Sequence, residues 1–275
     1  MMVKSIGLAV LAAAAVLAQE GGLSARRIRE HTKFLSSDLM EGRGVGTRGG
    51  QLATEYIAGQ LALAGAKPAG DNGTWFQNVP LVGVETQPDS TLGAAARGKE
   101  VDLKFGDDFV GVDGTQRPDT RFEAETVFVG HGITAPEFQW DDFKGVNVTG
   151  KVLVMFTNEP PSDNPKFFDG PALTYYGRWT YKYEEALRRG ARGAIIIHTT
   201  PTASYGWDVV RSSWGREAPF VKVGANEKAL ELQGWISREA GEKLLALAGK
   251  TVDELLAAAE KPDFKPVELG IQVRA

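Results

Sequence analysis

The spacing of hydrophobic positions in residues 24–64 is typical of helices, because apolar residues recur there at about every third or fourth position. Ser24 stands directly before the first such stretch, where a helix N-cap is expected. The second stretch ends at Gly65, and glycine commonly ends helices. The pattern predicts two helices, joined by a glycine-rich connector at residues 41–50.

A different pattern follows the irregular residues 66–123, which hold short apolar runs between turn residues. Segments 126–129, 151–157 and 194–198 each contain an apolar run and have the length of buried strands. A helical segment at 181–189 separates the second run from the third. Strand, helix and strand in this order predict a βαβ unit with parallel strands.

Helix signals return near the end of the sequence. Ser237 is placed to cap a helix that Gly249 ends, and Thr251 with Glu254 forms the capping box of a final short helix before Pro262. Because strands and helices are both well represented, the predicted fold class is α+β.

Composition narrows the class of protein. The chain has 275 residues, 43% of them hydrophobic, which is ordinary for a globular protein. Its net charge of -4 and scattered positive residues give no electrostatic case for a nucleic-acid partner. It contains no cysteine, so the fold depends on its core without disulfides.

The first residues predict export. Lys4 precedes an apolar run at residues 6–17, and Ala18 stands where a small residue is expected at a cleavage site. The run is shorter than the roughly 20 residues that a membrane span needs. We therefore expect a signal peptide at residues 1–18, a secreted or periplasmic protein, and no membrane contact after cleavage. The alternative is an apolar tail or a buried helix.

The three histidines do not form a metal motif. His31, His131 and His198 are far apart, and none begins a His-x-x-x-His or His-x-Asp pair. A zinc site needs several such ligands around one ion. We interpret His31 as part of a helix face, His131 as part of a turn and His198 as the end of a strand, and assign no metal ligand.

Two acidic residues, Glu184 and Glu185, could in principle act as base and ligand at a metal. They lie in a segment that we expect to be a solvated helix, with Arg188 and Arg189 in reach for ion pairs. We favour the ion pairs.

The sequence also gives little support for a serine-nucleophile site. The sequence has no Gly-x-Ser-x-Gly elbow, and the serines after His198 lie in a loop-like stretch at residues 202–216. A hydrolase site around His198 is kept only as a third hypothesis, and no catalytic or cofactor-binding residue is assigned. The connector at 41–50 lacks the Gly-Lys-Ser/Thr ending of a P-loop, so we interpret it as structural. Its Arg43 and Arg48 could bind carboxylates on a neighbouring domain.

Several segments together carry a family resemblance. Residues 35–50 read LSSDLMEGRGVGTRGG, residues 53–58 read ATEYIA, residues 65–70 read GAKPAG and residues 75–80 read WFQNVP. This series resembles the N-terminal signature of metallopeptidase family twenty-eight, the di-zinc aminopeptidases. The resemblance implies that residues 24–64 belong to an α/β peptidase domain.

A second set of segments resembles the protease-associated domain that many members of this family contain. These segments are VGHGI at 129–133, WDDF at 140–143, GKVLV at 150–154 and RGARGAIII at 189–197. Residues 264–270, FKPVELG, resemble the family's return towards the peptidase domain. The resemblance implies a β-rich sandwich or open barrel with flanking helices, beside the N-terminal helices of an incomplete zinc-peptidase domain.

The expected organisation has four parts: a signal peptide at 1–18, an N-terminal peptidase-family segment at 19–98, a protease-associated domain with flanking segments at 99–255, and a return segment at 256–275. Residues 99–219 are expected to fold by themselves. The helices of residues 24–64 should have poorly covered apolar faces, because their own sheet is missing.

The resemblance implies part of a secreted zinc-dependent aminopeptidase, which removes N-terminal residues from peptides. In the family the zinc ligands follow the return segment and open with a His-x-Asp, and no position up to Ala275 matches them. Two zinc ions are therefore expected in a parent protein and none in this chain, which alone should be inactive and serve substrate gating and domain stability. The expected partners are a peptide or protein substrate and the missing peptidase domain. The alternative is a stand-alone, non-catalytic binding module.

Overall fold

The structure is a computed structural model that describes residues 22–275. The predicted signal peptide at 1–18 lies outside the described residues and stays a prediction. The chain divides into two compact units, Met1–Val79 and Pro80–Ala275, which we call unit 1 and unit 2 and describe separately.

Unit 1 contains the two predicted helices and two short 3-10 helices. Their bounds are α2 Ala25–Leu35, η1 Asp38–Met40, α3 Arg48–Leu63 and η2 Asp71–Gly73. The hydroxyl of Ser24 caps α2 by accepting the backbone N–H of Arg27 at 3.3 Å. Thr47 caps α3 in the same way, accepting the N–H of Gly50 at 3.1 Å. Gly65 follows α3 with a φ of +81°, so the predicted helix ends are confirmed.

Close packing explains the glycines of the connector between α2 and α3. A Cβ atom on Gly49 would overlap the carbonyl oxygens of Met40 and Gly42. The loop therefore passes over the first turn of α3 at a distance that only glycine permits. This geometry agrees with the structural interpretation of residues 41–50.

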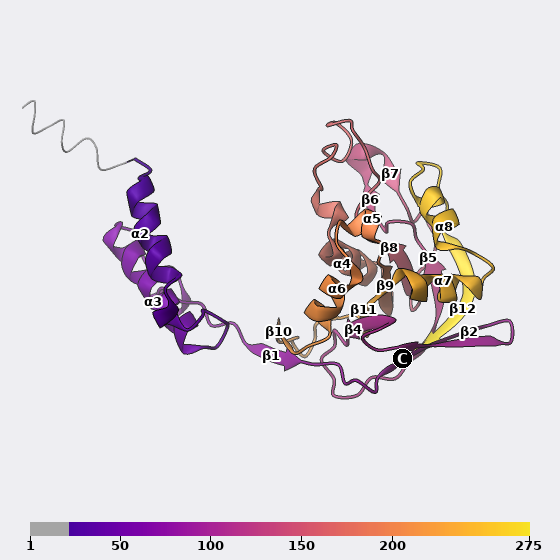
Figure 1. The fold of residues 1–275 in the computed structure, drawn as a ribbon, viewed down its shortest axis with the longest axis horizontal. Helices are drawn as coiled ribbons and strands as arrows, with labels where there is room; N and C mark the ends of the chain where they lie inside the picture. The colour runs from indigo at the N-terminus through magenta and orange to yellow at the C-terminus, as the bar shows by residue number, and fades with distance from the viewer. Residues whose placement is uncertain (1–21) are drawn as a thin grey trace, which may run out of the picture. The chain divides into compact units, whose positions relative to one another are not determined.

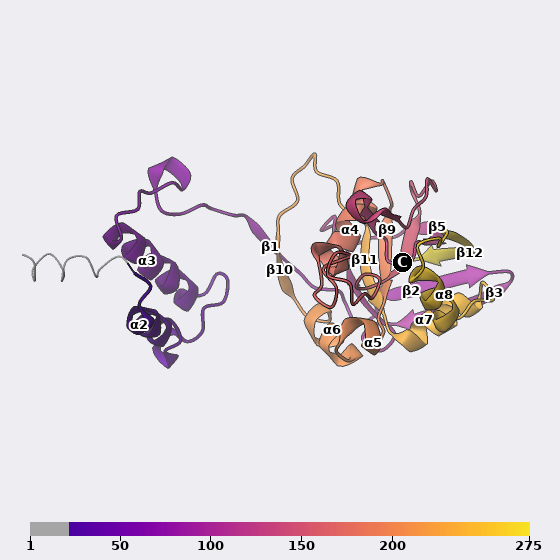
Figure 2. The ribbon, with the colours of Figure 1, turned by 90° about the horizontal axis from the view of Figure 1, so that it is seen from above.

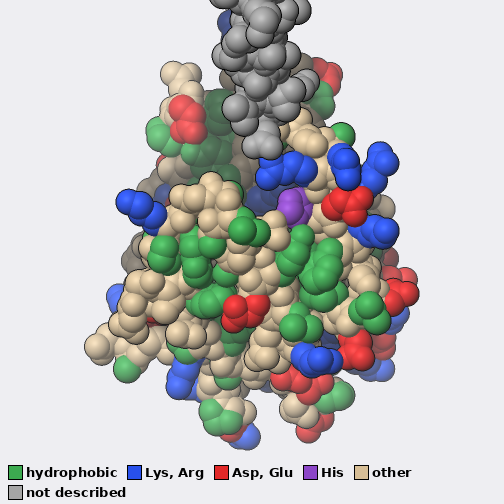
Figure 3. All heavy atoms as spheres, turned by 90° about the vertical axis from the view of Figure 1, so that its left-hand side faces the viewer, with side chains coloured by type: hydrophobic (Ala, Val, Ile, Leu, Met, Phe, Trp, Pro, Cys, Tyr) green, Lys and Arg blue, Asp and Glu red, His purple; other side chains and the backbone are tan. Residues whose placement is uncertain are grey.

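Unit 1 buries few hydrophobic side chains. Among its described residues these are Met40, Ala53 and Ala58. Several larger apolar side chains of α2 and α3 are each at least 42% exposed, whereas Leu35 is half-buried. The exposed ones are Ile28, Phe34, Leu52, Ile57, Leu61 and Leu63. Figure 3 shows hydrophobic side chains open to the surface on one face of the molecule. So small a core is marginal even for a domain of about 60 residues, and the expected uncovered apolar faces are observed.

Unit 2 is organised around one eight-stranded mixed sheet (Figure 1). Its strands are β2 Thr91–Ala96, β3 Lys99–Lys104, β4 Phe109–Val112, β5 Glu123–Phe128, β8 Val152–Phe156, β9 Gly193–Ile197, β11 Leu232–Ile236 and β12 Val267–Arg274. The strand order is β3-β2-β12-β5-β8-β9-β11-β4. Strands β5, β8, β9 and β11 are parallel, and the remaining pairs are antiparallel. An isolated bridge between Phe105 and Phe109 joins the two edge strands, so the sheet nearly closes on itself.

Helices cover the sheet. Their bounds are α4 Trp179–Arg188, α5 Thr200–Ala203, α6 Trp207–Trp214, α7 Arg238–Ala246 and α8 Val252–Ala259. Helix α4 connects the parallel strands β8 and β9, which confirms the predicted βαβ unit. The side-chain hydroxyls of Ser237 and Thr251 cap α7 and α8, also as predicted. No helix among residues 22–275 is long and apolar enough to cross a membrane.

Both faces of the sheet are buried, which explains why the central strands are continuously apolar. In β8, Val152, Val154 and Phe156 belong to one core, whereas Leu153 and Met155 belong to the other. Helices α7 and α8 contribute to the first core, and α4 and α6 contribute to the second. Figures 1 and 2 show these two helix pairs flanking the parallel strands.

Two small elements complete unit 2. The ribbon of β1 Leu81–Val84 and β10 Ala218–Val221 is antiparallel and separate from the main sheet (Figure 2). The pair β6 Thr134–Ala135 and β7 Trp140–Asp141 flanks η3 Pro136–Phe138. With η4 Tyr175–Gly177 and the long loop between β8 and α4, it forms an aromatic lobe whose buried members are Ile133, Ala135, Trp140, Phe168 and Tyr181.

The α+β prediction is confirmed at the level of a large, nearly closed mixed sheet with helices. That residues 99–219 fold alone stays a prediction, and the segment lacks three strands of the sheet, namely β2, β11 and β12. Without them β3 has no neighbouring strand, and β4 loses its partner β11. The division at Val79 and Pro80 also differs from the predicted boundary at residues 98 and 99.

We expect residues 80–275 to unfold in one cooperative transition, whereas residues 80–262, which lack β12, should show none. Removing β12 leaves the β2–β3 hairpin without a neighbour, and an isolated hairpin is marginal in water. Thermal melts followed by near-ultraviolet circular dichroism measure this, with the full chain as control. Cooperative unfolding of 80–262 at the control's midpoint would show that β12 is dispensable.

Candidate functional site

The three histidines lie in the three local settings predicted for them. His31 is on α2, where its Nδ1 is 2.9 Å from the hydroxyl of Tyr56. His131 is buried in the turn after β5, and His198 is buried directly after β9. Within residues 22–275, no group of three or more His, Cys, Asp or Glu side chains is arranged to hold a metal ion.

The acidic pair on α4 forms the predicted ion pairs. Glu185 contacts Arg188 at 2.7 Å and Arg189 at 2.6 Å, and Glu184 lies 3.7 Å from Arg188. The expectation of a solvated helix is wrong, because α4 packs on the sheet and Glu185 is itself buried. The carboxylate of Glu185 is thus engaged in ion pairs along α4.

The surroundings of His198 are aromatic. Its ring centroid lies 5.7 Å from that of Tyr205, 5.9 Å from Trp207 and 6.4 Å from Trp235. The hydroxyls of Ser212 and Ser213 donate instead to the carbonyl of Val209. Among the residues described, no serine bonds to His198, and its Nε2 has no hydrogen-bond partner. Burial also lowers the pKa of His198.

A buried polar cluster occupies the carboxyl ends of β5 and β8. Asp142 accepts the backbone N–H groups of His131 at 3.2 Å and Ile133 at 3.0 Å, and the indole N–H of Trp140 at 2.9 Å. The fully buried Lys182 of α4 donates to the carbonyl of Asn158 at 2.7 Å. These contacts tie the turn after β5, the aromatic lobe and α4 together.

Burial dominates the electrostatics of this cluster. It raises the pKa of Asp142 to about 6 and lowers the pKa of Lys182 to about 7, although their opposite charges partly counteract both shifts. Burial also lowers the pKa of His131 to about 3, so this histidine stays neutral. Shifted pKa values are common at functional sites, but none of these three residues lines either cavity described below.

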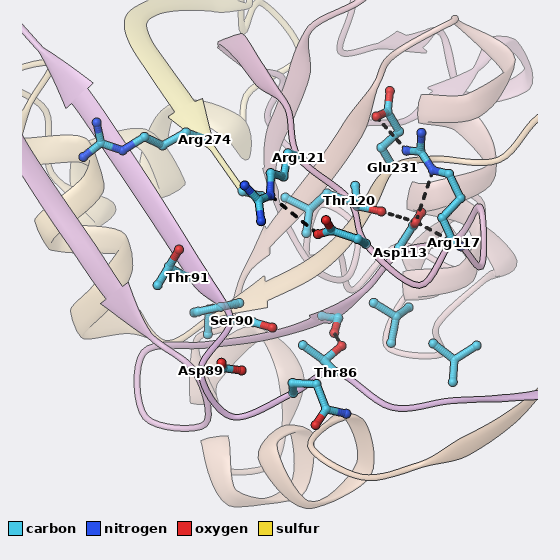
Figure 4. Close-up of a pocket in the computed structure, with 18 of the residues that line it drawn as sticks. Thr86, Asp89, Ser90, Thr91, Asp113, Arg117, Thr120, Arg121, Glu231 and Arg274 are labelled. Carbon is cyan, nitrogen blue, oxygen red and sulfur yellow. Dashed lines mark hydrogen bonds and ion pairs between the residues drawn. The ribbon is translucent and has the colours of Figure 1, made fainter.

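An open polar cleft of about 600 Å³ lies where the β1–β2 connection and the loop after β4 pass the ends of β11 and β12 (Figure 4). The carboxylate of Asp113 organises the loop by accepting the backbone N–H and the hydroxyl of Thr115 at 2.7 and 2.6 Å. It also accepts the hydroxyl of Thr120 and lies 3.6 Å from the guanidinium of Arg117. Asp113 thereby fixes one wall of the cleft.

The charges of the cleft are largely paired with one another. Arg117 contacts Glu231 at 2.9 Å, and Glu231 also contacts Arg192 at 2.6 Å. The hydrogen bond from Arg192 is the main cause that lowers the pKa of Glu231. On the other side, Arg274 pairs with Glu100 at 2.9 Å. A cleft with balanced charges suits a neutral polar ligand better than a strongly charged one.

An apolar cavity of about 260 Å³ adjoins this cleft beside the β1–β10 ribbon, with Val84, Leu187, Phe220 and Val223 in its lining.

The sequence did not single out Asp113 or Lys182. Asp113 precedes Gly114 and Thr115, and this order of residues is a turn signal that could have located the loop. No pattern in the sequence distinguishes Lys182 from a surface lysine. Its burial becomes evident only from the packing of α4.

No protein-family model matches the sequence, and no curated protein sequence matches it either. Among solved structures, two of BSAP, a zinc aminopeptidase from Bacillus subtilis, are similar at 16% identity. One match covers 82% of this chain and 42% of that chain with a TM-score of 0.30. The other, at medium resolution, covers 78% and 40% with a TM-score of 0.31. This chain thus spans less than half the length of those proteins, and the similarity is loose.

We expect the stability of the wild-type chain to rise between about pH 7 and 10 relative to the variant Lys182→Met. A lysine in the unfolded chain has its ordinary pKa of 10.5, above the folded value of about 7, so the unfolded state binds more protons in this window. Stability therefore increases with pH, by at most about 1.4 kcal/mol per pH unit. Urea unfolding at pH 7, 8 and 9 measures the difference.

The matched control is Lys222→Met, which changes an exposed lysine and should follow the wild type at every pH. Parallel pH profiles for the wild type and Lys182→Met would mean that Lys182 is not titrating in the folded core.

Proposed function

We propose that this chain is the N-terminal and protease-associated portion of a secreted zinc-dependent aminopeptidase. The observation that carries the proposal is the small core of unit 1. Residues 24–64, which include much of the family resemblance, form α2, η1 and α3, and within the described part of unit 1 they bury only three hydrophobic side chains, Met40, Ala53 and Ala58. Such helices need the cover of a further domain, and the peptidase domain implied by the resemblance would supply it.

The role of the chain itself is substrate gating and domain stability. The side chains of residues 22–275 do not fit a zinc site, so the two zinc ions belong to the rest of the parent protein. We derive no catalytic step from this chain. The proposed partners are a peptide or protein substrate and the peptidase domain, in a secreted or periplasmic setting without nucleic acid or membrane contact.

The alternative function is a stand-alone, non-catalytic binding module. The observation that favours it is the well-formed core of unit 2, which covers both faces of its sheet without help from another chain. The polar cleft of Figure 4 would then be the binding surface.

We expect the purified chain not to hydrolyse aminoacyl reporter substrates, even with added zinc, because it lacks a set of zinc ligands. The same chain extended by its downstream coding sequence should hydrolyse them, if that sequence continues in frame through a His-x-Asp. The control replaces that downstream histidine by alanine. Chelator-sensitive turnover by the purified chain would contradict the proposal, and a stop codon directly after Ala275 would favour the binding module.

We also expect the double variant Ile57→Ser and Leu61→Ser to destabilise the extended parent far more than the present chain. Both side chains are more than 40% exposed here, whereas full burial of each is worth about 1.5–3 kcal/mol. Chemical unfolding of both proteins measures the loss, with the exposed Thr54→Ser as control. An equal loss in both proteins would mean that no further domain covers α3.

A further inference from the structure

The β1–β10 ribbon has a fixed pattern of hydrogen bonding. The backbone N–H of Lys222 donates to the carbonyl of Pro80 at 2.9 Å, and Val82 lies opposite Phe220. In an antiparallel pair, every second residue exchanges hydrogen bonds with its partner and the residues between them turn their backbone groups outwards. The outward residues of β1 are therefore Leu81 and Gly83.

The outer edge of β10 is closed by its own sequence. Its outward residues are Pro219, which has no N–H, and Val221. The side-chain amide of Gln116 donates to the carbonyl of Val221 at 2.8 Å and accepts the N–H of Val223 at 2.9 Å. The side-chain amide of Gln116 thus occupies the hydrogen-bonding groups that a neighbouring strand would use.

The outer edge of β1 is open. Leu81 and Gly83 are exposed, and their backbone N–H and C=O groups make no hydrogen bond to any other residue that the structure describes. Two N–H and two C=O groups at alternate positions match one extended strand. The ribbon therefore offers one edge, and only on the side of β1.

The side chains beside this edge define what the added strand should contain. The carboxylate of Glu217 lies over Gly83, on the face where a side chain of that residue would stand. Glu217 forms no ion pair within the described part of the chain. Leu81 stands on the same face and is 43% exposed. In an antiparallel strand, a residue opposite Gly83 would meet the carboxylate, and the residue two positions later would meet Leu81.

We propose that β1 binds an extended peptide segment by antiparallel strand addition, with a lysine or arginine opposite Gly83 and an apolar residue opposite Leu81. The motif is basic-x-apolar. Backbone hydrogen bonds would provide the affinity, and Glu217 with Leu81 would provide the selectivity. Strand addition at β1 needs no catalytic centre and does not rest on the proposed function.

The test uses the ¹⁵N-labelled full chain and the blocked peptide acetyl-Thr-Lys-Thr-Leu-Thr-amide, followed by NMR titration. We expect the largest amide shifts, together with slower hydrogen exchange, at Leu81 and Gly83. N-methylation of the peptide at its lysine removes a hydrogen bond to β1 and should weaken binding about fivefold to tenfold. N-methylation of the central threonine, whose N–H faces away from β1, is the matched control and should leave binding within about twofold.

Two variants test the edge and the carboxylate separately. Gly83→Pro deletes an outward N–H that the ribbon does not use and also displaces the carboxylate of Glu217, so it should weaken binding of both the lysine peptide and a glutamine peptide while the rest of the spectrum stays folded. Glu217→Gln should weaken binding of the lysine peptide several-fold but leave a peptide with glutamine in place of lysine unchanged.

Equal binding of the two N-methylated peptides, or shifts away from Leu81 and Gly83, would overturn strand addition. Analytical sedimentation tests whether a second copy of this chain, rather than a peptide, pairs with the edge of β1. A dimer of the free chain that Gly83→Pro abolishes would assign the β1 edge to a second copy of this chain and would also overturn the proposal.

Discussion

The pairing of β12 with two strands from distant parts of the chain holds unit 2 together. On one side β12 pairs with β2, which begins at Thr91, and on the other with β5, which ends at Phe128. The antiparallel hairpin and the parallel half of the sheet meet through this strand, and otherwise only through the single bridge between Phe105 and Phe109. The core beneath it, with α7 and α8, depends on the same pairing, because its side chains come from both halves.

The sequence predicts those features of the fold that depend on residues close together in the chain. The helix caps at Ser24, Ser237 and Thr251 and the βαβ unit around α4 depend on neighbouring residues, and the sequence predicts them correctly. The position of β12 depends on partners more than 130 residues away, for which a single sequence holds no pattern. The same limit made residues 99–219 look like a complete domain.

The polar residues show the same division. The ion pairs of Glu185 are contacts along one helix and were predicted. The burial of Lys182 and the network around Asp113 and Glu231 arise from tertiary packing, so residue type and spacing did not reveal them. What they share is stabilisation of loops: Lys182 holds the aromatic lobe to α4, and Asp113 holds the wall of the polar cleft.

The place of β12 also has a consequence for how the protein is made. The sheet cannot be completed until residues 267–274 have been synthesised, after every other strand of unit 2. Contacts of such long sequence separation form slowly, because the intervening chain must first be ordered. The sheet of unit 2 therefore stays incomplete until nearly all of the unit has been synthesised. The delay is compatible with the proposed export, since a polypeptide without a finished core can cross a membrane before it folds.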